Sequence, residues 1–530
     1  MTSRKLLKTL NSQIVDGENN AVVCQQAYAI DQGNLVEVIN ALKTRYGPEI
    51  FLLPLSATSG GGGIFQRAAP QGGAIIGLQF TPTAHPAVSC ARGHATVDTG
   101  LDQIVIDRDN HYIYAGAAIT LDQLTQALAA ELGPRYKVLG ADLTSYSYAQ
   151  VGATFMTGGM GPQRRYFSDS ISEIALFDGA EVKTIGGDDL SHYAGTYGWT
   201  GIVCAVRCRF QKMPGNEIAF ALPVNNTPAK LGKLLQHLAP YCFLQASTAD
   251  VQNSHGQPAV ILGIEHITTN AMAPMFAQGV DNIITRRAHQ LAQKCTDANA
   301  DGLVFVNGFV DTDIDEFLFQ LVDNPDIEPL SIADINLEHS EIFKDPEQMR
   351  AVREAVPFAA RTQAPAGRFI YKGHTDATIR LNIDSVESSM QRLWQSNEAY
   401  VSAVSDYFDC QPRVRGQILV YGHMNPYGVD PHNRLTFASD EQQAFTEAVD
   451  HVHRLRDQFL VALQDLCLNS GSEFIGGEKG AGSEHEMFDA FGGPDHAPAA
   501  LKQKFKKQYQ AIQSASPMFN WRALPPYIEC

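Results

Sequence analysis

The sequence predicts an α+β fold, and three observations point to it. Short apolar segments of strand length alternate with segments that have the apolar period of an amphipathic helix over most of the chain. Residues 440–470 then run without proline or glycine and have helical character. The chain has 530 residues, of which 44% are hydrophobic and 18% charged, and this composition indicates a globular protein rather than a disordered chain, a collagen or a coiled coil.

The first part of the chain is rich in glycine and mixes short strands with short helices. Residues 27–30 and 51–56 are predicted strands, and 74–78 is a further apolar strand. Between the first two lies a predicted amphipathic helix, whose apolar residues at helical spacing are Leu35, Val36, Val38, Ile39 and Leu42.

The same part of the chain continues with three more units. Residues 111–120 are a predicted strand, followed by a helix over 121–132 that Gly133 ends. Residues 171–185 are a predicted hairpin closed by Asp178-Gly179. The strand over 201–213 completes this block, because Pro214-Gly215 follows it.

The second part has longer strands separated by helices. The predicted strands are 217–224, 259–267, 302–310, 368–373, 377–384 and 416–425, and residues 227–239 form a predicted helix. From residue 439 the pattern becomes helical. We therefore expect a first domain over 1–213, a second over 214–438 with an antiparallel sheet, and a helical C-terminal segment over 439–530.

Charge and targeting signals restrict the classes of partner. The formal net charge of −17 repels phosphate backbones, so nucleic acid is not expected as a partner. The N-terminus lacks the apolar run of a signal peptide, and no apolar stretch is long enough for a transmembrane segment. The nine cysteines are odd in number and contain no CxxC pair, which indicates reduced thiols rather than a disulfide framework. These features predict a cytoplasmic protein.

Two glycine-rich segments are candidate cofactor loops. The first, PLSATSGGGGIF at 54–65, has four consecutive glycines whose backbone N–H groups can approach an anion closely. It is not a P-loop, because no lysine follows, and it does not open a helix as a Rossmann motif does. The second is YAQVGATFMTGGMGPQRRYFSDSI at 148–171. Either segment alone is equally consistent with a surface loop, but together they suggest a dinucleotide held between two loops.

These two loops, with IYAGAAITLDQLTQAL and GTYGWTGIVCAVRCRF, resemble the flavin domain of the vanillyl-alcohol-oxidase superfamily, also called the PCMH-type FAD fold. The resemblance covers about residues 20–213 and implies a two-subdomain FAD-binding domain. It implies that the first loop binds the FAD pyrophosphate, the second lies along the flavin, and a strand residue sits near the adenine. The FAD-binding residues that it implies are Pro54, Ser56, Ala57, Thr58, Ser59, Gly60, Gly61, Gly62, Gly63, Gly152, Thr154, Thr157, Gly158, Gly161 and Ile202.

A candidate metal site lies in the second half of the chain. YGHMNPYGVDPHNRL contains His423 and His432, and GSEFIGGEKGAGSEHE contains Glu478. Two imidazoles and a carboxylate can hold a divalent metal and leave positions open for a substrate. The alternative is two unrelated loop histidines and a surface acid, because spacing does not bring residue 478 beside residue 423.

The same segments are similar to those of the D-2-hydroxyacid dehydrogenase branch of this superfamily, which includes D-lactate, glycolate and D-2-hydroxyglutarate dehydrogenases and has an FAD-linked oxidase C-terminal domain. The resemblance implies a divalent metal, zinc or manganese, on His423, His432 and Glu478. The residue after the glutamate is the catalytic base in that family, and here it is Lys479, which needs a lowered pKa to accept a proton. His374 is the alternative base, although a core or surface histidine is its commoner explanation.

Further matches to this branch concern the substrate and the flavin. The resemblance implies that Arg353 and Lys372 hold the substrate carboxylate, for which a guanidinium fork and an ammonium are suited. The alternative for this pair is an ordinary helix charge and a strand-end lysine. The C-terminal Asn520 would reach the flavin, although Trp521-Arg522-Ala523 replaces the Pro-Gly-Lys that follows in the family.

The predicted function is therefore FAD-dependent oxidation of a D-2-hydroxyacid, with the O–H proton taken by the base and hydride passing to flavin N5. The partners expected are a small carboxylate substrate and an electron acceptor, which is a quinone, an electron-transfer protein, a cytochrome or oxygen; a homodimer is left open. Two alternatives remain. One is a metal-free FAD oxidase of a phenol, alcohol or sugar, and the other is a flavin-binding protein without catalysis.

Overall fold

The computed structural model describes the larger part of the first domain and of the second domain up to residue 362, with shorter segments after it. The described residues are 8–10, 24, 26–30, 35–56, 74–80, 84–91, 100–143, 145–159, 161–163, 166–225, 227–242, 259–269, 272, 276, 281–323, 336–362, 377–380, 391, 413–418, 422–427, 443, 447, 454, 473–474 and 499–519. Within this part of the chain, no helix combines the length and apolar character needed to cross a bilayer.

The first domain begins with a small sheet of order β1-β2-β4-β3. Strands β2, β4 and β3 are parallel, and helix α1 makes the crossover from β2 to β3. The helix buries four of its five predicted apolar residues, whereas Val36 is 36% exposed because it is rotated away from Leu35 by one helical step. The bounds are β1 Lys8–Leu10, β2 Gln26–Ile30, α1 Leu35–Tyr46, β3 Ile50–Leu55 and β4 Ala74–Phe80.

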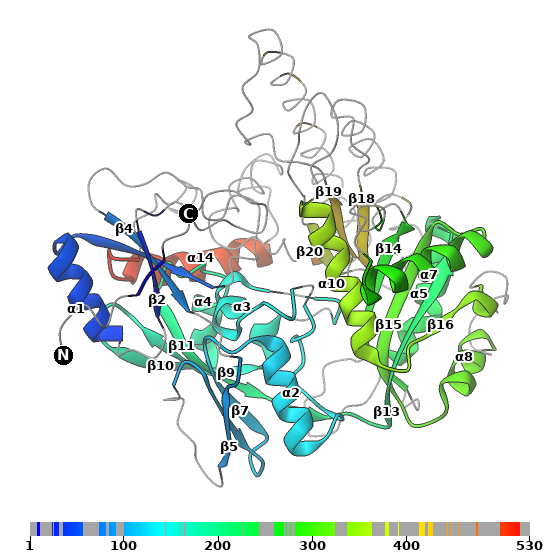
Figure 1. The fold of residues 1–530 in the computed structure, drawn as a ribbon, viewed down its shortest axis with the longest axis horizontal. Helices are drawn as coiled ribbons and strands as arrows, with labels where there is room; N and C mark the ends of the chain where they lie inside the picture. Colours follow the sequence, from blue (N-terminus) through cyan, green and yellow to red (C-terminus); the bar gives the residue numbers. More distant parts are fainter. Residues whose placement is uncertain are drawn as a thin grey trace.

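A second sheet of order β10-β9-β11-β7-β6-β5 lies beside the first (Figure 1). The predicted hairpin is confirmed as β9 and β10, with Phe177 opposite Val182. The predicted helix is α2, which begins at a capping box on Thr120 and ends at Gly133. The bounds are β5 Ala87–Ala91, β6 Gln103–Asp107, β7 Tyr112–Gly116, α2 Leu121–Leu132, β9 Ile171–Phe177, β10 Val182–Gly186, α4 Leu190–Tyr193 and β11 Ile202–Arg209.

The second glycine segment contains a helix that the sequence analysis did not predict. Helix α3, Val151–Thr157, buries Val151 and Phe155 completely and ends where Gly158 adopts a left-handed conformation, φ 66°. Seven residues are two helical turns, too few for a periodic apolar pattern to stand out among glycines. The helix nevertheless determines which residues of this segment are buried.

The second domain is built on a sheet of order β16-β13-β15-β14-β18-β19-β17-β20, in which all neighbours are antiparallel. The expected antiparallel sheet is thus confirmed. One predicted strand, 416–425, is wrong, because the chain reverses between Ile418 and Gly422, which face each other. The bounds are β13 Asn216–Val224, β14 Ala259–Thr268, β15 Gly302–Val310, β16 Glu341–Ile342, β17 Ala377–Arg380, β18 Arg413–Ile418, β19 Gly422–Tyr427 and β20 Glu473–Phe474.

Helices cover both faces of this sheet. On strand β13, Ala219 and Ala221 pack with helices α7 and α10, while Phe220 between them contacts Phe317 of α8. Successive side chains of a strand point to opposite faces, so the two sets of helices lie on opposite sides. The bounds are α5 Pro228–Leu238, α7 Ile283–Asp297, α8 Ile314–Val322 and α10 Pro346–Thr362.

A buried histidine in β14 makes stability depend on pH. Burial lowers the pKa of His266 to about 4, so the folded protein keeps this imidazole neutral while the unfolded chain protonates it near its ordinary value. Stability is therefore complete above that ordinary value and is lost as pH falls toward 4. We expect a loss of about 2 kcal/mol between pH 7 and pH 5 from this group. Urea unfolding at both pH values should show a smaller loss for His266→Gln, and an equal loss in both proteins would contradict the assignment.

Candidate functional site

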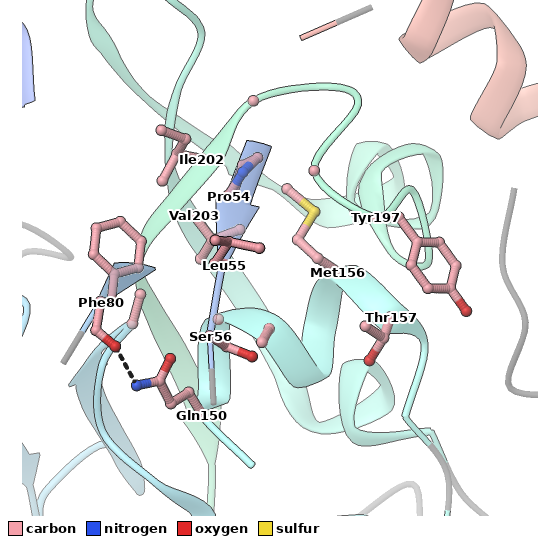
Figure 2. A pocket seen from close by; sticks show the side chains of 15 residues that line it. Pro54, Leu55, Ser56, Phe80, Gln150, Met156, Thr157, Tyr197, Ile202 and Val203 are labelled. Atoms are coloured by element: carbon pink, nitrogen blue, oxygen red, sulfur yellow. Dashed lines mark hydrogen bonds between the residues drawn. The ribbon is translucent and has the colours of Figure 1, made fainter. Parts of the chain in front are cut away.

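A pocket opens in the first domain where five chain segments meet, at residues 54–56, 80, 117, 150–157 and 197–203. Figure 2 shows Pro54 and Leu55 at the end of β3, Phe80 at the end of β4, helix α3, and Ile202 at the start of β11. The loop between α4 and β11 closes it with residues 197, 198 and 201. The pocket has about 550 Å³ of empty space, a figure that includes solvent at its mouth.

Among the described residues, the lining of this pocket is mainly apolar and carries no charged side chain. Gln150 is its most buried polar residue, 1% exposed, and its amide nitrogen donates to the carbonyl of Phe80 at 2.8 Å. The amide oxygen of Gln150 is buried and accepts no hydrogen bond from the described residues. An acceptor left in this state costs free energy unless a ligand donates to it.

Three glycines allow the walls of the pocket to approach one another. A Cβ on Gly152 would lie 2.7 Å from the Cβ of Ala117, and one on Gly198 would lie 3.0 Å from Pro54. Gly201 has φ 144° and a Cβ there would lie 2.5 Å from the carbonyl oxygen of Phe177. The glycines are therefore required by the packing of the walls and not only by loop flexibility.

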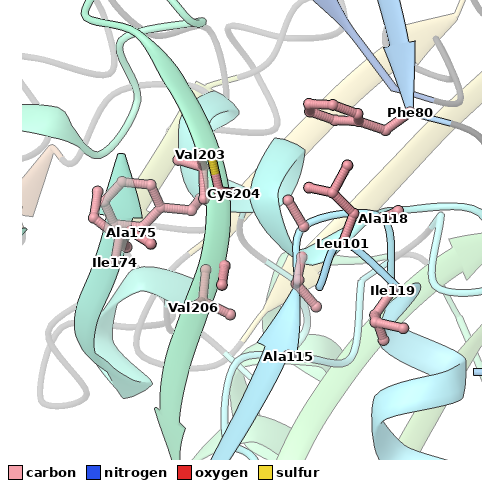
Figure 3. Close-up of a cluster of buried hydrophobic side chains, with 14 of the residues drawn as sticks. Phe80, Leu101, Ala115, Ala118, Ile119, Ile174, Ala175, Val203, Cys204 and Val206 are labelled. Atoms are coloured by element: carbon pink, nitrogen blue, oxygen red, sulfur yellow. The ribbon is translucent and has the colours of Figure 1, made fainter. Parts of the chain in front are cut away.

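A packed core supports the pocket from below. Figure 3 shows Phe80 and Val203, which also line the pocket, above a cluster that includes Ala118, Ile119 and Val206. These side chains come from β4, from β11 and from the connection between β7 and α2. Because this core spans both sheets of the first domain, it fixes the pocket walls relative to each other.

Five of the residues that the resemblance assigned to FAD line this one pocket. They are Pro54, Ser56, Gly152, Thr157 and Ile202, which come from three segments of the chain. Their spacing in the sequence does not predict that these residues lie together. The fold brings them to one pocket.

Three other assigned residues lie next to the pocket and serve its structure. The hydroxyl of Thr154 donates to the backbone carbonyl of Gln150 at 2.9 Å. Gly158 ends α3, and a Cβ on Gly161 would overlap the carbonyl oxygen of Asp142. These residues therefore hold the shape of the second glycine segment.

Most of the other assigned residues lie outside the described residues. His423 belongs to β19 by its backbone, and nothing is described of its side chain. In the described part of the chain, no three His, Cys, Asp or Glu side chains are grouped to hold a metal ion. The assigned residues that lie outside the described residues are Ala57, Thr58, Ser59, Gly60, Gly61, Gly62, Gly63, Lys372, His374, His432, Glu478, Lys479 and Asn520.

Arg353 lies in a buried charge cluster between the two domains. Its Nε donates to Glu265 at 2.5 Å and its Nη1 to Asp142 at 3.2 Å, and the three side chains are at most 6% exposed. Asp142 comes from the first domain, whereas Arg353 of α10 and Glu265 of β14 belong to the second. The cluster thus links α10 to Asp142, and Gly161 packs against the backbone carbonyl of that residue.

Further charges complete this cluster. Arg350, one turn before Arg353, donates to Glu217 at 2.7 Å, and Lys137 donates to the same carboxylate at 2.8 Å. Burial alone raises the pKa of Asp142, but the charges of Arg353 and Arg350 outweigh it and hold this pKa below its ordinary value. Arg353, Arg350 and Lys137 therefore face three well-buried carboxylates, Asp142, Glu217 and Glu265, and Arg350 also pairs with the more exposed Glu347.

Several residues of the site were not predicted from sequence. Gln150, Met156 and Tyr197 line the pocket, and Phe80 receives the hydrogen bond of Gln150. The sequence offers no sign that Tyr197 faces α3. That contact depends on the left-handed backbone of Tyr197, φ 52°.

Comparisons with known proteins bear on the fold. No protein-family model matches this sequence, and no curated protein sequence matches it. Among solved structures, an alkyldihydroxyacetonephosphate synthase is similar over 93% of this chain and 75% of its own, with a TM-score of 0.54 and 9% sequence identity. A second structure of such a synthase matches 83% of this chain and 76% of its own, with a TM-score of 0.48 and 10% identity. The chain therefore shares the α+β fold of the first of these solved structures.

Proposed function

We propose that this chain binds FAD in the pocket of the first domain and works as an FAD-dependent oxidoreductase. The observation that carries the proposal is the convergence of Pro54, Ser56, Gly152, Thr157 and Ile202 on one pocket. The fold is compatible with it, because a solved synthase structure is similar over 93% of this chain. The activity itself rests on the resemblance of the sequence to FAD-linked oxidoreductases.

The residues present fit this cofactor. Among the described residues, the pocket lining contains no carboxylate, so none of them opposes a diphosphate in a chain whose net charge is −17. Apolar walls suit the faces of a flat ring, and the amide oxygen of Gln150 offers an acceptor to a ring N–H. When bound, FAD supplies a two-electron acceptor, and the protein supplies binding, orientation and exclusion of water.

We further propose a D-2-hydroxyacid as the substrate. This step rests on the GHMNPYGVDPHNRL and GGEKGAG segments and on Arg353 and Lys372. Within the described residues, two N–H groups of Arg353 are engaged by Glu265 and Asp142, so a substrate carboxylate would take the donors that remain. A metal on His423, His432 and Glu478, with Lys479 or His374 as the base, completes the hypothesis.

The proposal is tested with the full-length protein. We expect purified protein to carry or take up FAD and to show the visible absorption of a flavoprotein. Anaerobic mixing with a panel of D- and L-2-hydroxyacids, phenols, primary alcohols and sugars should bleach this absorption with a D-2-hydroxyacid. A chelator should prevent the bleaching if a metal takes part.

The other outcomes separate the alternatives. Bleaching by phenols, alcohols or sugars with no effect of chelator would identify a metal-free oxidase and overturn the hydroxyacid hypothesis. Bound FAD that no substrate reduces would favour a flavin-binding protein without oxidase activity. If no substrate reduces the bound FAD, the reaction mixtures should also be analysed for products, because the similar structure is that of a synthase. Failure to bind FAD would overturn the whole proposal.

A further inference from the structure

The C-terminal helix packs on the first domain, next to the pocket. Helix α14, Ala499–Ser514, lies along α4 in Figure 1, more than 300 residues away in sequence. Helix α4 leads into the loop 194–201, which supplies Tyr197, Gly198 and Gly201 to the pocket. The contact therefore reaches the segment that closes the site.

One side chain makes the polar contact between α14 and this loop. Gln508 is 1% exposed, and its amide nitrogen donates to the backbone carbonyl of Ala194 at 2.5 Å. The same nitrogen lies 3.0 Å from the position a Cβ would take on Gly195. Gly195 in turn packs against Gly158, the residue that ends α3. Gln508 therefore lies directly behind the junction of the loop with the pocket helix.

The loop has a conformation that needs such support. Gly195, Tyr197 and Gly198 all have positive φ, of 75°, 52° and 78°. A left-handed conformation is costly for a bulky residue such as Tyr197, and it persists only where neighbouring contacts hold it. Two backbone hydrogen bonds hold the loop to α3. The N–H of Gly195 donates to the carbonyl of Phe155 at 3.0 Å, and the N–H of Tyr197 donates to the carbonyl of Met156 at 2.7 Å. The bond from Gln508 fixes the other side.

The residues that follow α14 contact strand β3, which forms another wall of the pocket. The backbone N–H of Leu52 in β3 donates to the carbonyl of Met518 at 2.9 Å. Phe519 is fully buried and packs edge-on against Phe177. Strand β3 continues from Leu52 to Pro54, which lines the pocket.

We propose that residues 499–519 form a clamp that sets the distance between β3 and the loop 194–201, and that Gln508 is a positioning residue for the ligand of the pocket. The inference rests on the proposed function in one respect, because FAD is taken as that ligand. The clamp acts through two backbone positions. Ala194 precedes Tyr197 in the loop, and Leu52 precedes Pro54 in β3, and both Tyr197 and Pro54 line the pocket. It places the C-terminal segment among the determinants of cofactor binding.

The experiment compares two glutamines of the same helix in the full-length protein. Gln508→Met keeps the volume of the side chain and removes the donor, whereas Gln510→Met changes an exposed position two residues later in the helix. We expect the dissociation constant for FAD, measured by quenching of flavin fluorescence, to rise about tenfold for Gln508→Met, which is the scale of one hydrogen bond. Gln510→Met should bind FAD as the unchanged protein does.

Hydrogen exchange of the FAD-free proteins gives a readout that does not depend on the cofactor. The amides of residues 195–200 should exchange faster in Gln508→Met, while those of α1 and β14 keep their protection. Equal exchange in the two variants would overturn the inference, and so would faster exchange throughout Gln508→Met, which indicates a general loss of stability. If the unchanged protein binds no FAD, the proposed function fails, and the exchange measurement still decides the role of Gln508.

Discussion

We expect replacement of Arg353 by methionine to lower the free energy of unfolding by about 3–5 kcal/mol. Methionine keeps much of the side-chain volume but leaves Asp142 and Glu265 without their shared cation. Both carboxylates are buried, so water cannot replace the lost partner. Urea unfolding followed by circular dichroism measures this loss.

A matched control is an exposed arginine on the neighbouring helix α7. Arg286 pairs with Asp281 at 3.2 Å, but the two side chains are 68% and 80% exposed. Arg286→Met should therefore cost less than about 1 kcal/mol. Arg353→Lys, which keeps the charge and loses the fork, should be intermediate. Equal stability of Arg353→Met and Arg286→Met would contradict the buried cluster.

The pH dependence gives a second signature of this cluster. In the unchanged protein the pKa of Asp142 lies below its ordinary value, so the stabilisation is present above that value and is lost as pH falls. Without Arg353, Arg350 and Lys137 are the cations left to oppose the effect of burial, so the pKa of Asp142 should rise from its lowered value and acid should relieve part of the penalty. We therefore expect the stability difference between the two proteins to narrow from pH 7 to pH 4.

The second large effect is expected at Gly201 in the wall of the pocket. An alanine there must keep φ near 144°, a conformation open mainly to glycine, and its Cβ would lie 2.5 Å from the carbonyl oxygen of Phe177. Strain and overlap together should cost about 2–4 kcal/mol. Because β11 must shift to relieve the overlap, Ile202 also moves, and we expect FAD affinity to fall by more than tenfold.

Gly133 provides the control for this substitution. It also has positive φ, 103°, but a Cβ there would meet nothing within 4 Å, and it ends α2 away from the pocket lining. Gly133→Ala should therefore show the cost of backbone strain alone and leave FAD affinity unchanged. If the two alanine variants bind FAD equally well, the contact with Phe177 does not shape the pocket.

Much of the secondary structure could be predicted from the sequence, because local patterns determine it. The apolar spacing from Leu35 to Leu42 predicted α1, and Asp178-Gly179 predicted the hairpin of β9 and β10. The prediction failed where an element was too short to show a periodic pattern, and where a strand-like run contained no turn signal. Helix α3 has only two turns, and the run over 416–425 gave no sign of the reversal between β18 and β19.

The candidate site divides in the same way. Glycines and small residues indicated which segments could approach a cofactor, since glycine is needed wherever chains pack closely. No local signal pointed to Gln150, whose importance comes from its burial beside Phe80. Likewise, Arg353 reads in the sequence as a helix cation suited to a carboxylate, but only the fold supplies Asp142 and Glu265 as its partners.

The sequence by itself determined the fold class, the glycine segments and the acidic character of the chain, because these depend on composition and short-range periodicity. The tertiary structure alone decided that Pro54, Gly152 and Ile202 share a pocket and that α14 returns to its edge. The reason is physical. Contacts between residues 50 to 300 positions apart form only when buried apolar surfaces bring the segments together, and a sequence pattern does not show which surfaces will meet.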